Sequence, residues 1–227
     1  MTTLSVDLII EELGKWVGNY IKSSGKKIAV VKWDDSPNSA LAIKVCHKAR
    51  SFHNTLSISV CINDKFPILE AKVPCNVYFR DNDCEVASEE NGIIIGLCDK
   101  TEVLNRNYSK RYDEYDNRVN GNADIFPLLD IYHSEVIDLV DTIFPELKVE
   151  PLSAEDSMIE WATKLNLHNG IVTDTNLPNK HPDWYKFTKN QKEFIAKIHQ
   201  REKNTRHKCL RNSNYCKLRS LKTNLFA

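Results

Sequence analysis

The chain has 227 residues, with 31 Lys and Arg against 31 Asp and Glu, so its formal net charge is zero. The length fits one large domain or one domain with an appendage, and the hydrophobic fraction of 41% supports a sizeable core, which excludes global disorder. No apolar run reaches the roughly 20 residues that a membrane helix needs. The N-terminus has no basic region ahead of its apolar residues, so we expect a cytoplasmic protein with no signal peptide and no membrane partner.

The first third of the chain predicts a βαβ unit of a parallel sheet. A helix over 6–21 is followed by a strand over 28–33 and a turn over 34–38. A helix from residue 39 to 49 then leads to an alternating strand over 56–62.

The middle of the chain predicts further strands of the same sheet. Residues 73–79 suggest one strand, residues 88–92 a loop, and the apolar run 93–95 a buried strand. Residues 133–144 have the apolar spacing of an amphipathic helix, which Pro145 ends. We therefore expect an α/β fold with an open, mostly parallel sheet flanked by helices.

The C-terminal part carries the basic charge. Residues 180–227 hold 13 Lys and Arg and 3 Asp and Glu, which leaves 18 and 28 in the preceding residues. Residues 148–183 look irregular, like a lid or connector, and 189–206 predict a basic helix with a narrow apolar stripe. We expect residues 1–147 to form a nucleotide-binding α/β domain and residues 148–227 to pack on it.

The seven cysteines indicate reduced thiols and not a disulfide framework. Their number is odd, no CxxC pair occurs, and several lie inside apolar patterns. A zinc site at His207, Cys209 and Cys216 is the alternative, although the spacing fits no standard zinc motif.

Polar side chains come shortly after the buried strand at 93–95 in the sequence. Asp99, Lys100 and Glu102 stand where this strand passes into a helix. Ligands of open α/β sheets bind at the carboxyl ends of the strands, so we expect a binding site here.

Three segments together resemble the NAD synthetase family, whose members are adenine-nucleotide α-hydrolase-like proteins of the N-type ATP pyrophosphatase group. The family patterns are SGGxDSAL, GTxNKTE, ADIxPxxDLYKTxV and T-x-HKR. The matching stretches are Val30-Val-Lys-Trp-Asp-Asp-Ser-Pro-Asn-Ser-Ala-Leu41, Gly96-Leu-Cys-Asp-Lys-Thr-Glu102 with Ala123-Asp-Ile-Phe-Pro-Leu128 and Asp130-Ile-Tyr132, and Thr205-Arg-His-Lys208.

The resemblance implies an ATP-dependent amide ligase. ATP adenylates the carboxylate of deamido-NAD and releases pyrophosphate, and ammonia then attacks the acyl adenylate to give NAD and AMP. The implied cofactors are ATP and Mg²⁺, the implied partners are deamido-NAD and ammonia, and the family is usually dimeric, so we expect a homodimer.

The resemblance also implies the site residues. Glu102 matches the magnesium-binding glutamate, and Asp35 is a second candidate metal ligand. The catalytic candidates are Glu102, His207 and Lys208, and the cofactor-binding candidates are Ser36, Asn38, Ser39, Lys100, Lys110 and Asp124.

The chain departs from the family patterns in the phosphate loop. The stretch Asp34-Asp35-Ser36-Pro37-Asn38-Ser39 replaces SGGxDS, so both glycines are missing and Pro37 has no N–H to donate. Leu97 and Cys209 replace a threonine and an arginine. A catalytically inactive homologue that binds a nucleotide or a protein partner is therefore an open alternative.

Other interpretations also remain open. The basic tail could bind nucleic acid, which we do not favour, or it could be a solvated helix face. The acidic turn at Asp34 and Asp35 could be solvated surface, Glu102 could serve only the helix dipole, and Asp124 could be a turn or cap residue. Lys100, Lys110 and His207 could be ordinary surface side chains.

Overall fold

The sheet is parallel and open, as the sequence predicts. The computed structural model describes residues 3–62, 73–80, 82–103, 123–167, 186–196, 216 and 218. Four described strands pair in the order β3-β2-β1-β4, and all three pairings are parallel. Their bounds are β1 Ile28–Lys32, β2 Ser57–Cys61, β3 Asn76–Tyr78 and β4 Ile93–Ile95.

Alternating side chains of the strands serve two different faces of the sheet. Ala29 and Val31 of β1 join the main core, whereas Val30 between them packs on the opposite face. The register pairs Ala29 with Ile93 and Val31 with Ile95 across β1 and β4. Both faces are therefore apolar, which explains why the strands have nearly continuous apolar sequences.

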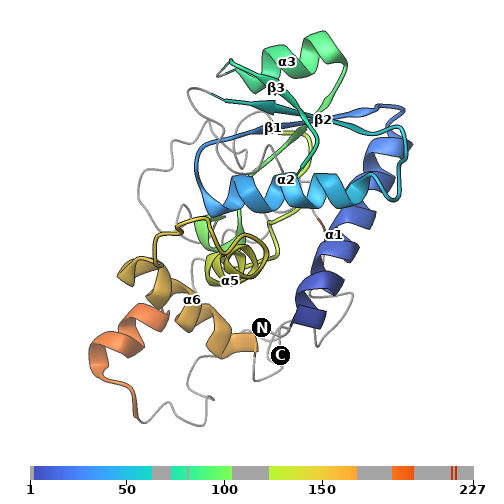
Figure 1. The fold of residues 1–227 in the computed structure, drawn as a ribbon. Coiled ribbons are helices and arrows are strands. Elements are labelled where there is room, and N and C mark those ends of the chain that lie inside the picture. Colours follow the sequence, from blue (N-terminus) through green and yellow to red (C-terminus); the bar gives the residue numbers. More distant parts are fainter. Residues whose placement is uncertain are drawn as a thin grey trace.

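Three helices cover the face that carries the main core. They are α1 (Thr3–Ser23), α2 (Pro37–Ala49) and α5 (His133–Ile143), and their buried side chains belong to the same apolar cluster as Ala29 and Val31 (Figure 1). Gly18 lets α1 approach α2 closely, because a Cβ at this position would lie 2.8 Å from the carbonyl oxygen of Ala49.

The helix α2 begins two residues earlier than expected. The sequence predicted a turn through Asn38, but Ser36 is the N-cap and Pro37 opens the helix. The Ser36 hydroxyl oxygen accepts a hydrogen bond from the Ser39 amide at 3.2 Å. Serine at the N-cap followed by proline at the first helical position is a favoured helix start.

The opposite face of the sheet is covered by α3 (Asp83–Glu90) (Figure 1). The predicted loop over 88–92 was wrong, because α3 continues to Glu90 and the loop begins only after it. Asn82 caps the start through its side chain, and Asn91 ends the helix in the left-handed conformation with φ 53°. Asparagine is one of the few residues besides glycine that commonly occupy this helix-ending position.

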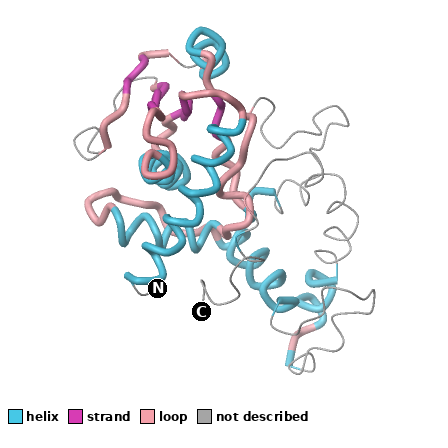
Figure 2. Tube along the Cα trace, turned by 90° about the vertical axis from the view of Figure 1, so that its right-hand side faces the viewer, coloured by secondary structure: helices cyan, strands magenta, loops and turns pink. Residues whose placement is uncertain are grey.

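The predicted irregular segment over 148–183 contains a helix, α6 (Ala154–Leu167). Its buried residues Ile159 and Ala162 form a small apolar cluster with Ile195, which lies in the helical residues 189–196 of the predicted basic helix. This cluster is separate from the main core, and α6 lies at the end of the molecule opposite α3 (Figures 1 and 2). The proposed division into residues 1–147 and 148–227 stays a prediction.

In the part of the chain that the structure describes, no helix is both long enough and apolar enough to span a bilayer.

Candidate functional site

The candidate site lies at the carboxyl ends of β1 and β4. The strand order reverses at β1, because the chain goes to β2 on one side and returns to β4 on the other. Open α/β sheets bind ligands at such a switch point. The loop after β1 leads into α2, and the loop after β4 leads into the helical residues 100–103.

Asn38 joins these two loops. Its side-chain Nδ2 donates to the carbonyl oxygen of Leu97 at 2.8 Å and to Asp99 Oδ2 at 2.9 Å. The phosphate-loop candidates and the polar residues after β4 therefore meet in space.

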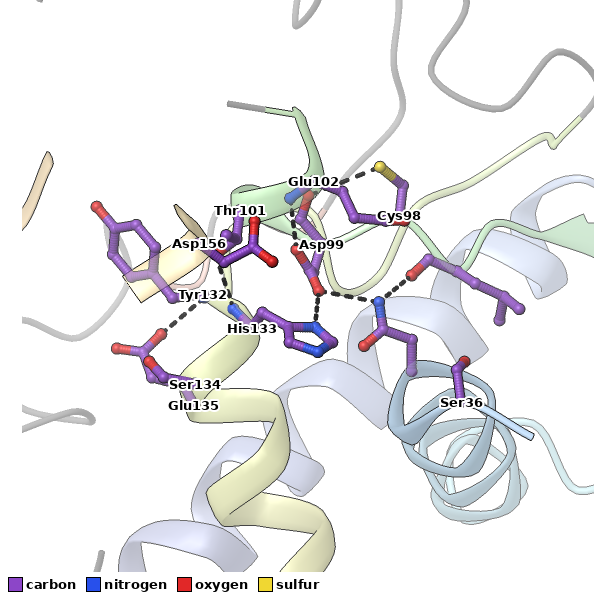
Figure 3. Close-up of polar contacts among 12 residues, drawn as sticks. Ser36, Cys98, Asp99, Thr101, Glu102, Tyr132, His133, Ser134, Glu135 and Asp156 are labelled. Carbon is purple, nitrogen blue, oxygen red and sulfur yellow. Dashed lines mark hydrogen bonds and ion pairs between the residues drawn. The ribbon is translucent and has the colours of Figure 1, made fainter. Parts of the chain in front are cut away.

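Asp99 is the buried centre of the site and has no exposed surface. Its Oδ2 also accepts from His133 Nδ1 at 2.6 Å, and its Oδ1 accepts from the backbone amide of Glu102 at 2.9 Å. Figure 3 shows this carboxylate between the two residues. The hydrogen bond to Asp99 raises the pKa of His133, burial of the imidazole opposes this effect, and the nearby negative charges add to it.

One polar atom of the Asn38 side chain, Oδ1, makes no hydrogen bond to the described residues. The Asn38 side chain is 5% exposed. The amide cannot simply be turned over, because both groups that Nδ2 contacts are acceptors. A buried acceptor without a donor costs about 1–3 kcal/mol, so a hydrogen-bond donor or a metal ion that reached Oδ1 would recover this cost.

The loop between β1 and α2 is closed by its own side chains. Asp34 Oδ1 accepts from the Ser36 amide at 3.1 Å, and the Ser36 hydroxyl oxygen takes the Ser39 amide. Asp35 has a φ of 60°, at a position where the family pattern has glycine, and its Oδ1 accepts from the Trp33 indole at 2.8 Å. The backbone amides of Ser36 and Ser39, which could otherwise donate to a phosphate, thus already donate to side chains of the loop.

A second buried carboxylate, that of Glu160, makes hydrogen bonds to residues next to the site. Glu160 of α6 is 3% exposed, and its Oε1 accepts from Thr101 Oγ1 at 2.6 Å and from the Ser134 amide at 3.0 Å. Its Oε2 accepts from the Ser134 hydroxyl. Thr101 Oγ1 in turn accepts from the His133 amide at 2.9 Å. Glu160 therefore ties α6 to both the residues after β4 and the start of α5.

The remaining candidates have other neighbours. The Lys100 Nζ lies 4.7 Å from the centre of the Tyr132 ring. The exposed Asp124 accepts a hydrogen bond from the Ile94 amide at 2.8 Å, so its carboxylate pairs with the backbone of β4. Glu102 is half-buried. The candidates outside the described residues are Lys110, His207 and Lys208.

The sequence did not single out Asp99 as the centre of the site, and it missed His133 and Glu160. Asp99 and His133 are 34 positions apart, and Thr101 and Glu160 are 59 positions apart, so only the folded chain brings each pair together. One available signal for α6 was the pair Ser153 and Asp156, which has the spacing of a capping box at the start of this helix.

The comparisons with known proteins identify the fold. An NH3-dependent NAD synthetase from Campylobacter jejuni superposes with a TM-score of 0.59 over 92% of this chain and 96% of its own, at 13% identity. The fold is that of the NAD synthetases. The NAD⁺ synthetase from Burkholderia pseudomallei gives a TM-score of 0.56 over 89% of this chain and 90% of its own, at 12% identity.

A U34-tRNA thiolase from Methanococcus maripaludis gives a TM-score of 0.47 over 97% of this chain and 89% of its own, at 15% identity. No protein-family model matches the chain, and no curated protein matches it. The chain therefore shares its fold with two NAD synthetases at 12–13% sequence identity.

Proposed function

We propose that this chain is an ATP-dependent amide ligase of the NAD synthetase kind, which converts deamido-NAD, ATP and ammonia into NAD, AMP and pyrophosphate. The observation that supports it best is the contact of Asn38 with Leu97 and Asp99. This contact brings together two of the segments that resemble the family, at the switch point of a sheet with the NAD synthetase fold. We also propose that the protein acts as a homodimer.

The residues at this point fit ATP and Mg²⁺ by the chemistry of their donor atoms. Mg²⁺ prefers carboxylate and amide oxygens, and Asn38 Oδ1 and the Glu102 carboxylate are such oxygens in the helical turns that follow the two loops. Mg²⁺ would offset the negative charge of the phosphates. Among the described residues no cluster of three or more His, Cys, Asp or Glu forms a metal site by itself, so the phosphates would supply further ligands.

A second candidate is a homologue that binds a nucleotide or a protein partner without turnover. The observation that favours it is the loop between β1 and α2, whose amides already make hydrogen bonds within the loop. The Ser36 amide donates to Asp34, and the Ser39 amide donates to the Ser36 hydroxyl oxygen. A polyphosphate at this loop would meet the Asp34 carboxylate in place of free amides, and like charges at close range repel. In this case ATP binds weakly or through its adenosine part, and no AMP forms.

One experiment separates the two candidates. The purified chain is incubated with ATP, Mg²⁺, deamido-NAD and ammonium, and AMP and NAD are measured. Formation of both in equal amounts, lost in Glu102→Gln and kept in the exposed control Glu150→Gln, supports the ligase. If no AMP appears above background while calorimetry detects ATP binding, the ligase proposal fails and the second candidate stands.

A further inference from the structure

A basic surface lies at the end of the sheet opposite the candidate site. The candidate site follows β1, whereas Lys26 and Lys27 directly precede this strand. The ends of α1 and α2 meet there, because Gly18 of α1 lies against Ala49, the last residue of α2 (Figure 1). We call this surface the basic edge. Its members, each exposed or half-buried, are Lys15, Lys22, Lys26, Lys27, Lys44, His47, Lys48 and Arg50.

The helices α1 and α2 bring their lysines to the same side of the molecule. A Cβ at Gly14 would lie 2.7 Å from Lys48 Cγ, so the Lys48 stem packs on α1 at the residue before Lys15. Lys44 lies one helical turn before Lys48, and residues four apart share a face of a helix. Lys15, Lys44 and Lys48 therefore carry their charges along the line where α1 meets α2.

The positive charge continues around the end of α2 and into the loop before β1. Burial lowers the pKa of His47, and the charges of Lys44 and Arg50 lower it further, which places both cations near this imidazole. Lys26 donates from Nζ to Asn91 Oδ1, so its ammonium group lies where β1 and β4 begin. No carboxylate of the described residues forms an ion pair with a member of the basic edge.

Compensation of the helix dipoles explains only part of this charge. Cations are favoured in the last turn of a helix, which accounts for Lys22 in α1 and Lys48 in α2. Lys15, Lys27 and Lys44 lie outside these last turns. The basic edge therefore holds more positive charge than the two helix ends require.

The basic edge also runs against the charge of the rest of the body. Residues 1–179 hold 18 Lys and Arg against 28 Asp and Glu, yet seven of the 18 cations gather here. The acidic residues between positions 13 and 56 are Asp34 and Asp35, which follow β1 at its other end. Opposite charges are thus separated between the two ends of the sheet, and such a concentrated positive surface attracts polyanions.

The composition of the basic edge favours a phosphate backbone over other polyanionic partners. The exposed large hydrophobic residues of the described chain, Leu8, Phe79 and Met158, do not belong to it. Protein interfaces are anchored by aromatic and other large side chains, and membrane-surface helices insert an apolar face. A nucleic acid needs only Lys and Arg to neutralise its phosphates, and lysines act there as point charges without reading bases.

We infer that the basic edge is a nucleic-acid-binding surface that contacts the phosphate backbone without reading the sequence. This role goes beyond the proposed ligase and does not depend on it, because the basic edge and the candidate site lie at opposite ends of β1. It also differs from binding through the basic tail, since the contact is placed on the folded body.

The test measures binding of the full chain to a labelled poly(U) RNA by fluorescence anisotropy, at salt concentrations from about 50 to about 200 mM. The tail is present in every variant, so it cannot cause a difference between them. A fourfold variant should bind at least tenfold more weakly at the lowest salt. Each lost contact with a single strand lowers the salt slope of log K by about 0.7, so the slope should fall by about 3. The four changes are Lys15→Gln, Lys27→Gln, Lys44→Gln and Arg50→Gln.

A matched pair of single variants separates the surface from the net charge. Lys27→Gln alone should lower the slope by about 0.7, whereas Lys148→Gln, at an exposed lysine outside the basic edge, should leave it unchanged. Urea unfolding of all variants checks that they fold. AMP formation by the fourfold variant should equal that of the wild type, so failure of the ligase and failure of this surface are separate results.

Duplex DNA and vesicles of phosphatidylcholine with phosphatidylserine serve as further probes. Salt-sensitive binding of RNA or DNA that the fourfold variant loses supports the inference. It is overturned if the wild type binds neither nucleic acid at the lowest salt, or if the fourfold variant binds as tightly as the wild type. Equal effects of Lys27→Gln and Lys148→Gln, or binding of the vesicles alone, would overturn it as well.

Discussion

Removal of the buried carboxylate of Glu160 should loosen the contact between α6 and the candidate site. Glu160→Ala leaves the hydroxyl of Thr101 and the amide of Ser134 without their acceptor. A buried donor left without a partner costs about 1–3 kcal/mol, so we expect a loss of about 3 kcal/mol in the free energy of unfolding. Glu160→Gln should cost only about 1 kcal/mol, because the remaining amide oxygen can take the place of Oε1 and accept both bonds.

Urea unfolding followed by circular dichroism measures both variants, with the exposed Glu150→Ala as a control that should stay within about 0.5 kcal/mol of the wild type. The comparison of Gln with Ala is the decisive part, since it separates loss of the acceptor from loss of the charge. A cost of less than about 1 kcal/mol for Glu160→Ala, or equal costs for the Gln and Ala variants, would contradict this role of the Glu160 carboxylate.

Gly96→Ala should destabilise the chain by about 1–3 kcal/mol in urea unfolding, because the new Cβ would lie 2.3 Å from the Phe126 ring; an unchanged midpoint would contradict this packing. Asp35→Gly should be more stable than Asp35→Ala by about 1 kcal/mol, because only glycine relieves the positive φ, and equal stabilities would argue against strain at this position. The raised pKa of His133 predicts that its contribution to stability is full below the unfolded pKa of about 6.5 and is lost as pH rises through the folded pKa. The loss of stability in His133→Gln, measured by urea unfolding, should therefore be larger at pH 5.5 than at pH 8.5, and a constant difference would refute this account.

The fold could be predicted from the sequence because its signals are local. The run Ile93–Ile95 and the alternating residues of β2 are short, apolar and rich in β-branched side chains, which indicates strands buried on both faces. The convergence of the two loops also followed, since the carboxyl ends of neighbouring parallel strands meet at one edge of the sheet.

The centre of the site was harder to predict because its residues act in pairs that are distant in sequence. Asp99 was noticed only as one polar residue after a strand, and His133 only as the start of a helix. Their hydrogen bond depends on the packing of α5 against the sheet. The helices α3 and α6 were missed for another reason, because each buries only a few apolar side chains and so has a weak amphipathic pattern.

The separate apolar cluster of α6 has a consequence for hydrogen exchange. The cluster is small, and buried polar contacts of Glu160 link α6 to the body of the protein, so the helix can open at a lower free energy than the sheet. Amide protons of α6 should then exchange by local opening, whereas those of β1 should exchange only through global unfolding. Each such opening would release Thr101 and Ser134 and give solvent and small molecules brief access to the edge of the sheet.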